Sequence, residues 1–438
     1  MESTKTIVAL LTFSAFLSPL KGQEQYMPDS LIMEMKRTYN KERRLEILWE
    51  IVKETHESNP DTAIYYANEQ QKLAKVLGNE EKFVKAIWAR GIIHKLNGNL
   101  KEAVNCFFES LDLYRKMNRT EKIAIALYNI GQVIMEGKNF SNALLYFKEA
   151  SNLNNERKDY QRVAKAQYEI ARCYLEMANY NKSLFHLNQC LKMNKSSENQ
   201  GLTSKAHNYL GINYYKLKEY DKAIMEYSKA RRYAIGLADY DKKSAIAYNN
   251  IGEVYVEKKD YQKAWSNFNK ALALKRKLGD QELLAGTLIN LGKLALLENR
   301  PSEAISYLEE IISILDKDRL SDHLKEASIL LSDAYKSKQD LTTKDLQKIM
   351  LLNKRYARHI HDLKQTGIQE SMISTISKNE LENVALHFKE KTKKTYYFTL
   401  WIIGLLIIII VTFLVLLRYK ERKFKSFIQQ MWKDIKDI

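Results

Sequence analysis

Cysteine, proline and glycine are all scarce in this chain of 438 residues. Its three cysteines, Cys106, Cys173 and Cys190, are too few and too irregularly spaced to build a disulfide framework or a metal site. Four prolines and 15 glycines leave few helix breakers, as we expect of an almost wholly helical chain.

The motifs of common enzyme classes are missing as well. The sequence has no phosphate-binding glycine loop, no HExxH zinc motif and no nucleophile elbow. We therefore predict no catalytic residues, no metal ligands and no cofactor, and we expect the protein not to be an enzyme.

Acidic residues are outnumbered by basic ones, 53 against 70, which gives a formal net charge of +17. Strong basicity is typical of nucleic-acid-binding proteins. Here, however, the lysines stand beside glutamates on the predicted helix faces, and no base-stacking motif occurs. The pattern favours a lysine-rich solvated surface, and we predict no nucleic-acid partner.

What the sequence does have is a repeat. A small residue returns every 40 residues, with one step of 41, at Gly91, Gly131, Ala171, Gly211, Gly252 and Gly292. Twelve residues after each comes a second small residue, and four further on a bulky apolar one. Self-similarity at this period indicates a solenoid of stacked units, which offers a binding surface rather than a catalytic site.

Each unit is predicted to be a pair of antiparallel helices. In the unit Ala245–Leu272, apolar residues at helical spacing predict two helices, and Lys258–Asp260 predicts the turn between them. Small residues at Gly252 and Ala264 allow the two backbones to approach closely, while aromatic residues fill the remaining space.

The cysteines fit into this pattern. Cys190 stands where other units have Ala150, Ala230 and Ala271, so we interpret it as a small buried residue. A bridge from Cys173 to Cys190, between the two helices of one unit, is the alternative.

The repeat resembles the tetratricopeptide repeat (TPR) family. The matching strings are "YNIGQVIMEGKNFSNALLYFKEA" from Tyr128, "NYLGINYYKLKEYDKAIMEYSKA" from Asn208 and "NNIGEVYVEKKDYQKAWSNFNKA" from Asn249. Six units run from about Val84 to Leu315, a degenerate unit precedes them at 44–78, and another follows from 325. The usual period is about 34 residues, so the helices or their connections are expected to be longer here. Such longer units look like those of kinesin light chain and of bacterial peptide-sensing regulators.

The resemblance implies a binding groove. In TPR arrays the first helices of successive units line a concave groove, and the second residue before the small glycine faces it. That position holds Asn129, Asn250 and Asn290, with Asn208 and Asn249 one residue earlier, and Trp88, Tyr128 and Tyr168 are candidate apolar pockets. An amide both donates and accepts, so a row of amides could hold an extended peptide without reading its sequence. The alternative is that these asparagines cap or bridge neighbouring helices.

Both ends of the chain predict a membrane protein. Residues 1–22 have the pattern of a secretory signal peptide, with an uncleaved signal anchor as the alternative. Residues 396–417 carry no charge, and at 1.5 Å per residue they are long enough to cross a hydrocarbon core of about 30 Å. The signal places the repeats outside the cytoplasm, and the basic residues after 417 favour a cytoplasmic tail.

The predicted fold class is all-α. It comprises a TPR superhelical solenoid of about six to eight helix pairs, a helical stalk and one C-terminal transmembrane helix. The predicted divisions are a signal peptide at 1–22, a lead-in at 23–43, the solenoid at 44–340, the stalk at 341–395, the transmembrane helix at 396–417 and a basic amphipathic tail at 418–438.

This layout is similar to the sensor portion of bacterial TPR-containing regulators. We expect a single-pass protein of the inner membrane whose extracytoplasmic solenoid binds a peptide or protein and acts as a receptor or adaptor. One alternative is the sensor part of a one-piece transcriptional regulator or histidine kinase that lacks its output domain. Another is a structural scaffold of the cell envelope. Further expected partners are the lipid bilayer, another membrane or cytoplasmic signalling protein, and a second copy bound through the stalk.

Overall fold

The computed structural model describes residues 29–196, 198–314 and 322–338. These belong to one of the two units into which the chain divides, residues 1–373. The described helices are α2 (Asp29–Arg37), α3 (Lys41–Thr55), α4 (Pro60–Val76), α5 (Glu80–Leu96), α6 (Leu100–Lys116), α7 (Thr120–Glu136), α8 (Phe140–Glu156), α9 (Tyr160–Glu176), α10 (Tyr180–Asn194), α11 (Gln200–Lys216), α12 (Tyr220–Tyr233), α13 (Tyr240–Glu257), α14 (Tyr261–Leu278), α15 (Gln281–Leu297), α16 (Pro301–Ile314) and α17 (Asp322–Lys336).

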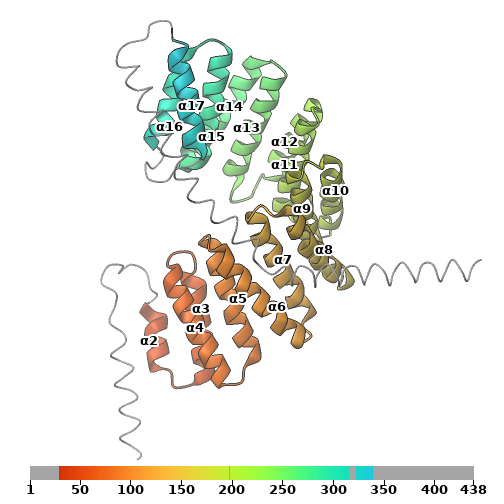
Figure 1. The fold of residues 1–438 in the computed structure, drawn as a ribbon, viewed down its shortest axis with the longest axis vertical. Helices are drawn as coiled ribbons and strands as arrows, with labels where there is room; N and C mark the ends of the chain where they lie inside the picture. The colour runs from red at the N-terminus through yellow and green to blue at the C-terminus, as the bar shows by residue number, and fades with distance from the viewer. Residues whose placement is uncertain (1–28, 197, 315–321, 339–438) are drawn as a thin grey trace, which may run out of the picture. The chain divides into compact units, whose positions relative to one another are not determined.

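Helices α3 to α16 form seven consecutive pairs, and no strand occurs among the residues just given. Each helix packs against the next along the chain, and the first helices of successive units also touch (Figure 1). Helix α17 packs against both α15 and α16, as expected of the first helix of a further unit. The predicted all-α solenoid is therefore confirmed over this part of the chain.

The period of 40 residues arises from long helices. Helices α4 to α9 all have 17 residues and are separated by three-residue connections. The extra length relative to a typical unit of about 34 residues therefore lies in the helices and not in the turns.

The three-residue turns share one backbone design. After α9, the amide of Ala178 donates to the carbonyl oxygen of Leu175 and that of Asn179 to the carbonyl oxygen of Tyr174. Ala178 has a positive φ of 54°, and the Asn179 side chain accepts from the next helix. This is a C-terminal left-handed cap followed at once by an N-cap. The predicted turn at Lys258–Asp260 has the same form, with Lys259 at a φ of 59°.

The two helices of a unit meet where the repeat places its small residue. A Cβ added to Gly252 would lie 2.5 Å from a ring carbon of Phe268, and one added to Gly131 would lie 2.8 Å from Phe147. Both phenylalanine side chains are fully buried. The close approach predicted from the small residues is therefore confirmed.

The unit formed by α9 and α10 solves the same packing problem differently. Ala171 stands at the glycine position, and the opposing residue is Leu187 instead of an aromatic, both without solvent exposure. A methyl group on the first helix is thus accommodated by a narrower side chain on the second.

The cysteines are free thiols and all three are buried. Cys190 has no exposed surface, as its alignment with alanines predicts. The alternative of a bridge between Cys173 and Cys190 is wrong, because the Cys173 Sγ instead contacts Met135 Sδ at 3.8 Å.

No helix among the described residues is both long and apolar enough to cross a membrane. The predicted signal peptide at 1–22, stalk at 341–395, transmembrane helix at 396–417 and tail at 418–438 all lie outside those residues.

We expect Gly252→Ala to lower the free energy of unfolding by about 1–3 kcal/mol, because its methyl group would overlap Phe268. This loss should outweigh the gain of about 1 kcal/mol that alanine brings to a helix interior. Gly286→Ala is the matched control, since its Cβ would meet only His323 Nε2 at 3.5 Å, and it should stabilise the protein. Denaturant unfolding monitored by circular dichroism measures both changes.

Adding Phe268→Leu to Gly252→Ala recreates the Ala171 and Leu187 combination of α9 and α10. The double variant should recover part of the stability that Gly252→Ala loses. If Gly252→Ala alone is as stable as wild type, the close approach does not constrain this position.

Candidate functional site

The residues predicted to line the groove lie on the first helices α5, α7, α9, α11, α13 and α15. Asn129 and Tyr168 are buried, with 7% and 8% of their surfaces exposed. The other predicted residues are half-buried: Trp88, Tyr128, Asn208, Asn249, Asn250 and Asn290. Their contacts form an aromatic group from α7 to α11 and an amide group from α11 to α15, with Trp88 apart from both.

The side chains of the aromatic group make hydrogen bonds and ring contacts with one another and with neighbouring charged residues. The Tyr128 hydroxyl donates to Glu169 Oε1 at 3.2 Å, across from α7 to α9. Arg172 donates to the same carboxylate at 2.8 Å and lies over the rings of Tyr168 and Tyr209. Burial, reinforced by the charge of Glu169, raises the pKa of the Tyr128 hydroxyl. These side chains form a closed polar and aromatic network across three helices.

Trp88 belongs to a different environment. It packs on α5 against the apolar cluster that holds Ile47, Ile51 and Ile93. Its buried indole nitrogen has no acceptor among the described residues. The structure therefore does not bring Trp88 together with the other predicted residues.

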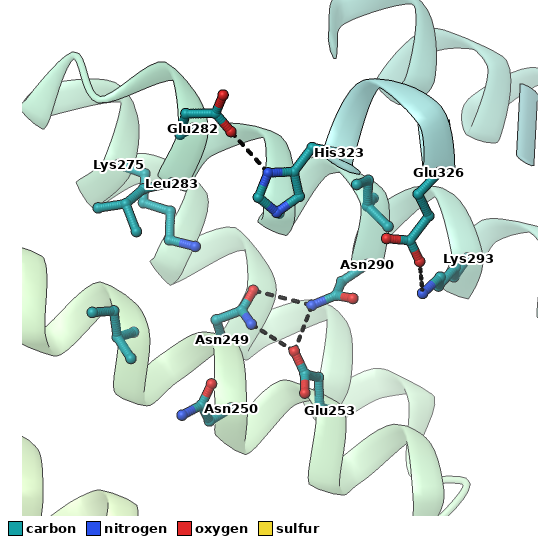
Figure 2. A pocket seen from close by; sticks show the side chains of 13 residues that line it. Asn249, Asn250, Glu253, Lys275, Glu282, Leu283, Asn290, Lys293, His323 and Glu326 are labelled. Atoms are coloured by element: carbon teal, nitrogen blue, oxygen red, sulfur yellow. Dashed lines mark hydrogen bonds and ion pairs between the residues drawn. The ribbon is translucent and has the colours of Figure 1, made fainter. Parts of the chain in front are cut away.

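The amide group borders a cavity of about 330 Å³ between α13, α14, α15 and α17 (Figure 2). The cavity is lined by Ile246, Asn249, Asn250, Glu253, Lys275, Glu282, Leu283, Gly286, Ile289, Asn290, Lys293, His323 and Glu326. Three of the predicted asparagines are thus gathered at one cavity, together with charged residues that the sequence pattern did not single out.

Asn249 and Asn290 are joined through Glu253. Asn290 Nδ2 donates to Asn249 Oδ1 at 3.2 Å and to Glu253 Oε1 at 2.8 Å, and Asn249 Nδ2 donates to Glu253 Oε1 at 2.7 Å (Figure 2). Burial raises the pKa of the Glu253 carboxyl, and the two amide donors oppose that shift. These hydrogen bonds bridge α13 and α15, as the alternative interpretation of the asparagines expects.

Some hydrogen-bonding capacity is left over. Asn290 Nδ2 directs both N–H groups at protein acceptors, which leaves its Oδ1 to accept from a ligand. Asn250 Nδ2 donates to Asn208 Oδ1 at 3.1 Å, so Asn250 keeps one N–H and its Oδ1. Asn249 accepts from both Asn290 and Thr287 and is mainly a bridging residue.

Lys275 is the residue that sequence reasoning missed. It comes from the second helix α14, is 4% exposed, and its Nζ donates to Thr287 Oγ1 at 2.6 Å. It forms no ion pair with any described residue. Burial lowers the pKa of its ammonium group to about 8. The sequence does single out Lys275, because it is charged where the equivalent positions in the preceding units are not. Those positions hold Ala74, Tyr114, Asn154, Asn194 and Ala234.

Two further contacts at the cavity join α15 and α17. His323 Nδ1 lies 2.9 Å from Glu282 Oε2, and Lys293 Nζ lies 2.6 Å from Glu326 Oε1 (Figure 2). Among the described residues, no group of three or more histidine, cysteine, aspartate or glutamate side chains could hold a metal ion. The arrangement is suited to binding a polar ligand by hydrogen bonds and charge.

We expect the burial of Lys275 to appear in the pH dependence of stability. Its pKa is about 8 in the folded protein against 10.5 as the ordinary value, so the unfolded chain binds more protons between these pH values. The free energy of unfolding of wild type should therefore rise relative to Lys275→Met, by about 3 kcal/mol, as the pH increases through this range. Denaturant titrations of both proteins at a series of pH values measure the difference. If the difference in the free energy of unfolding between wild type and Lys275→Met did not change with pH, this would contradict a buried charge at position 275.

The model of the tetratricopeptide repeat family matches residues 122–196, 202–277 and 243–317. No curated protein matches the sequence. The solved structures that resemble the chain include a signal transduction ATPase with numerous domains and a TPR sensor from Pyrococcus horikoshii. The Pyrococcus horikoshii protein is 14% identical to this chain, with a TM-score of 0.55. The match covers 79% of this chain and 52% of that one.

Two further structures have lower scores. The apo quorum sensor NprR from B. thuringiensis is 16% identical with a TM-score of 0.48, over 75% of this chain and 97% of that one. A Rap protein complexed with competence and sporulation factor is 15% identical with a TM-score of 0.46, over 78% and 99%. At such identities the solved structures bear on the fold alone. The family match over residues 122–196 and 202–317, together with the stacked helix pairs, shows that this chain contains tetratricopeptide repeats.

Proposed function

We propose that this chain is a membrane-anchored TPR protein that binds a peptide or protein partner, acting as a receptor or adaptor. The observation that carries the proposal is the cavity between α13, α14, α15 and α17, where Asn250 and Asn290 keep unused hydrogen-bonding groups. A TPR array presents such first-helix residues on one continuous surface. An extended peptide offers an N–H and a C=O at each residue, and both can pair with amide side chains.

The position of the partner site in the cell is part of the same proposal. A signal peptide at 1–22 would export the repeats, and an uncharged stretch at 396–417 would anchor them in the inner membrane. The solenoid would then meet its partner outside the cytoplasm. The basic tail at 418–438 would lie in the cytoplasm, where it can contact the anionic leaflet or a signalling protein.

A topology experiment tests the membrane part. We expect a reporter enzyme that is active only outside the cytoplasm to be active when fused after position 30 or 380, and inactive when fused after the last residue. Inactivity of the first two fusions would remove the receptor and adaptor proposals together. Such a result would leave the TPR fold untouched.

A crosslinking experiment tests the binding part. We expect the full-length chain to capture a specific partner from membranes, and Asn250→Ala with Asn290→Ala to reduce that capture by about tenfold, since each hydrogen bond contributes about 0.5–1.5 kcal/mol. The melting temperature should change little. Asn105→Ala, which alters an exposed asparagine on the second helix α6, is the matched control and should capture as wild type does.

Asn249→Ala provides a contrast within the same network. It removes one of the two amide donors to Glu253 and the acceptor of the Thr287 hydroxyl, which should lower the free energy of unfolding by about 1–3 kcal/mol. A double variant of Asn250 and Asn290 that captures the partner as wild type does would contradict a binding role for these amides. In that case the scaffold alternative would be favoured.

A further inference from the structure

Helix α7 begins unlike the other first helices. From α3 to α15 the others have asparagine or aspartate at the N-cap, and in all but α13 this side chain accepts from a backbone amide of its helix. These residues are Asn40, Asn79, Asp159, Asn199, Asp239 and Asp280. Helix α7 has Arg119 there, and no side chain caps it. A guanidinium cannot accept a hydrogen bond, and its charge is unfavourable at the positive end of a helix.

Two backbone amides in the first turn of α7 are left unused. The amides of Glu121 and Lys122 donate to no acceptor among the described residues. In α5, the amide of Lys82, which is equivalent to that of Lys122, donates to Asn79 Oδ1 at 3.1 Å. Free amides at the start of a helix, together with the helix dipole, favour an anion.

The start of α7 borders a cavity of about 360 Å³, which is within the size range of small-molecule sites. The cavity is lined by Glu81, Tyr114, Met117, Asn118, Arg119, Thr120, Glu121, Lys122 and Arg157. These residues come from the start of α5, the end of α6, the turn into α7 and the residue after α8. None of them borders the cavity between α13, α14, α15 and α17.

Tyr114 has an unused hydroxyl at this cavity. The residue is 6% exposed, and its hydroxyl makes no hydrogen bond to another described residue. Its position in the repeat directs side chains at the next first helix, since the equivalent Asn194 donates to the carbonyl oxygen of Asn199 at 2.8 Å. Burial, reinforced by the charge of Glu81, raises the pKa of the Tyr114 hydroxyl to about 12, so it stays protonated and can donate. A buried hydroxyl without a partner is costly, and a ligand oxygen would relieve that cost.

Positive charge is in excess around the cavity. Two carboxyl groups, those of Glu81 and Glu121, face three cations, Arg119, Lys122 and Arg157. Glu121 is also shared, with Oε2 3.3 Å from Arg157 and Oε1 3.0 Å from Arg162. Arg119 and Lys122 form no ion pair with another described residue. An anion at the start of α7 would therefore meet cations that the protein leaves unpaired.

We propose that this cavity binds the phosphate group of a small phosphomonoester, or free phosphate. The donors are the amides of Glu121 and Lys122, the Tyr114 hydroxyl and the side chain of Arg119. A phosphate has three strong acceptor oxygens and up to two negative charges, so it can use donors on several sides. Met117 offers the organic part of the ester an apolar surface. The site is independent of the proposed function, because helix ends form it and it shares no residue with the partner cavity.

The experiment uses the full-length chain purified in detergent, in a buffer without phosphate. Binding of phenyl phosphate and of benzoate is measured by ligand-observed NMR. We expect phenyl phosphate to bind at least about tenfold more tightly than benzoate, since it brings more charge and a third acceptor oxygen. Inorganic phosphate should compete with phenyl phosphate for the site.

Three variants separate the site from the fold. Arg119→Asn restores the N-cap residue found at Asn79, and it should weaken phenyl phosphate binding by at least about tenfold while the unfolding midpoint stays the same or rises. Tyr114→Phe removes only the hydroxyl and should weaken binding by about tenfold. Arg300→Asn is the matched control. This arginine also stands directly before a helix but is paired with Glu298 at 2.7 Å, so the variant should bind as wild type does.

Equal binding of phenyl phosphate and benzoate would overturn the phosphate site, as would wild-type affinity in both Arg119→Asn and Tyr114→Phe. A third probe, N-acetyl-phosphoserine N-methylamide, tests the class of ligand. If it bound at least about tenfold more tightly than phenyl phosphate, the ligand would be a phosphorylated protein and the small-molecule proposal would be wrong. Partner capture by Arg119→Asn should equal that of wild type, so failure of this site and failure of the proposed function are seen separately.

Discussion

The close approach of the two helices within each unit is the constraint on which the rest of the structure depends. In four units a glycine on the first helix lies against a buried ring of the second, and at Gly252 there is no room for a methyl group. Because the helices are held this closely, three residues are enough to join them, and the turn is built in the same way in the six units from α5 to α16. Stacking of such pairs then places the first helices of successive units side by side.

This regularity makes departures from the pattern informative. Core positions that recur as alanine, such as Ala206 and Ala247, show what packing alone requires. When Thr287 replaces alanine and Gly286 replaces a long side chain, the change cannot be attributed to the fold. The polar network of Asn249, Glu253 and Asn290 lies beside these departures. These departures and the network meet at one cavity, in the last described units of the array.

The aromatic and amide halves of the predicted groove differ in what remains available to a partner. Tyr128 and Tyr168 are tied into a network with Glu169 and Arg172, which stabilises the array across three helices. Asn250 and Asn290 are also hydrogen-bonded, yet an amide has more donor and acceptor sites than these contacts use. Bridging and binding are thus compatible at these two residues, because the same side chain can do both.

The sequence by itself determined the fold, since a 40-residue period with a small residue opposite a bulky one allows only stacked helix pairs. It also placed Asn250 and Asn290 on the first helices. It did not reveal Lys275 as a site residue, because α14 is a second helix and periodicity assigns its inner face to the core. Only the tertiary structure shows the ammonium beside Thr287 at the cavity, since the two residues come from different helices and meet through packing.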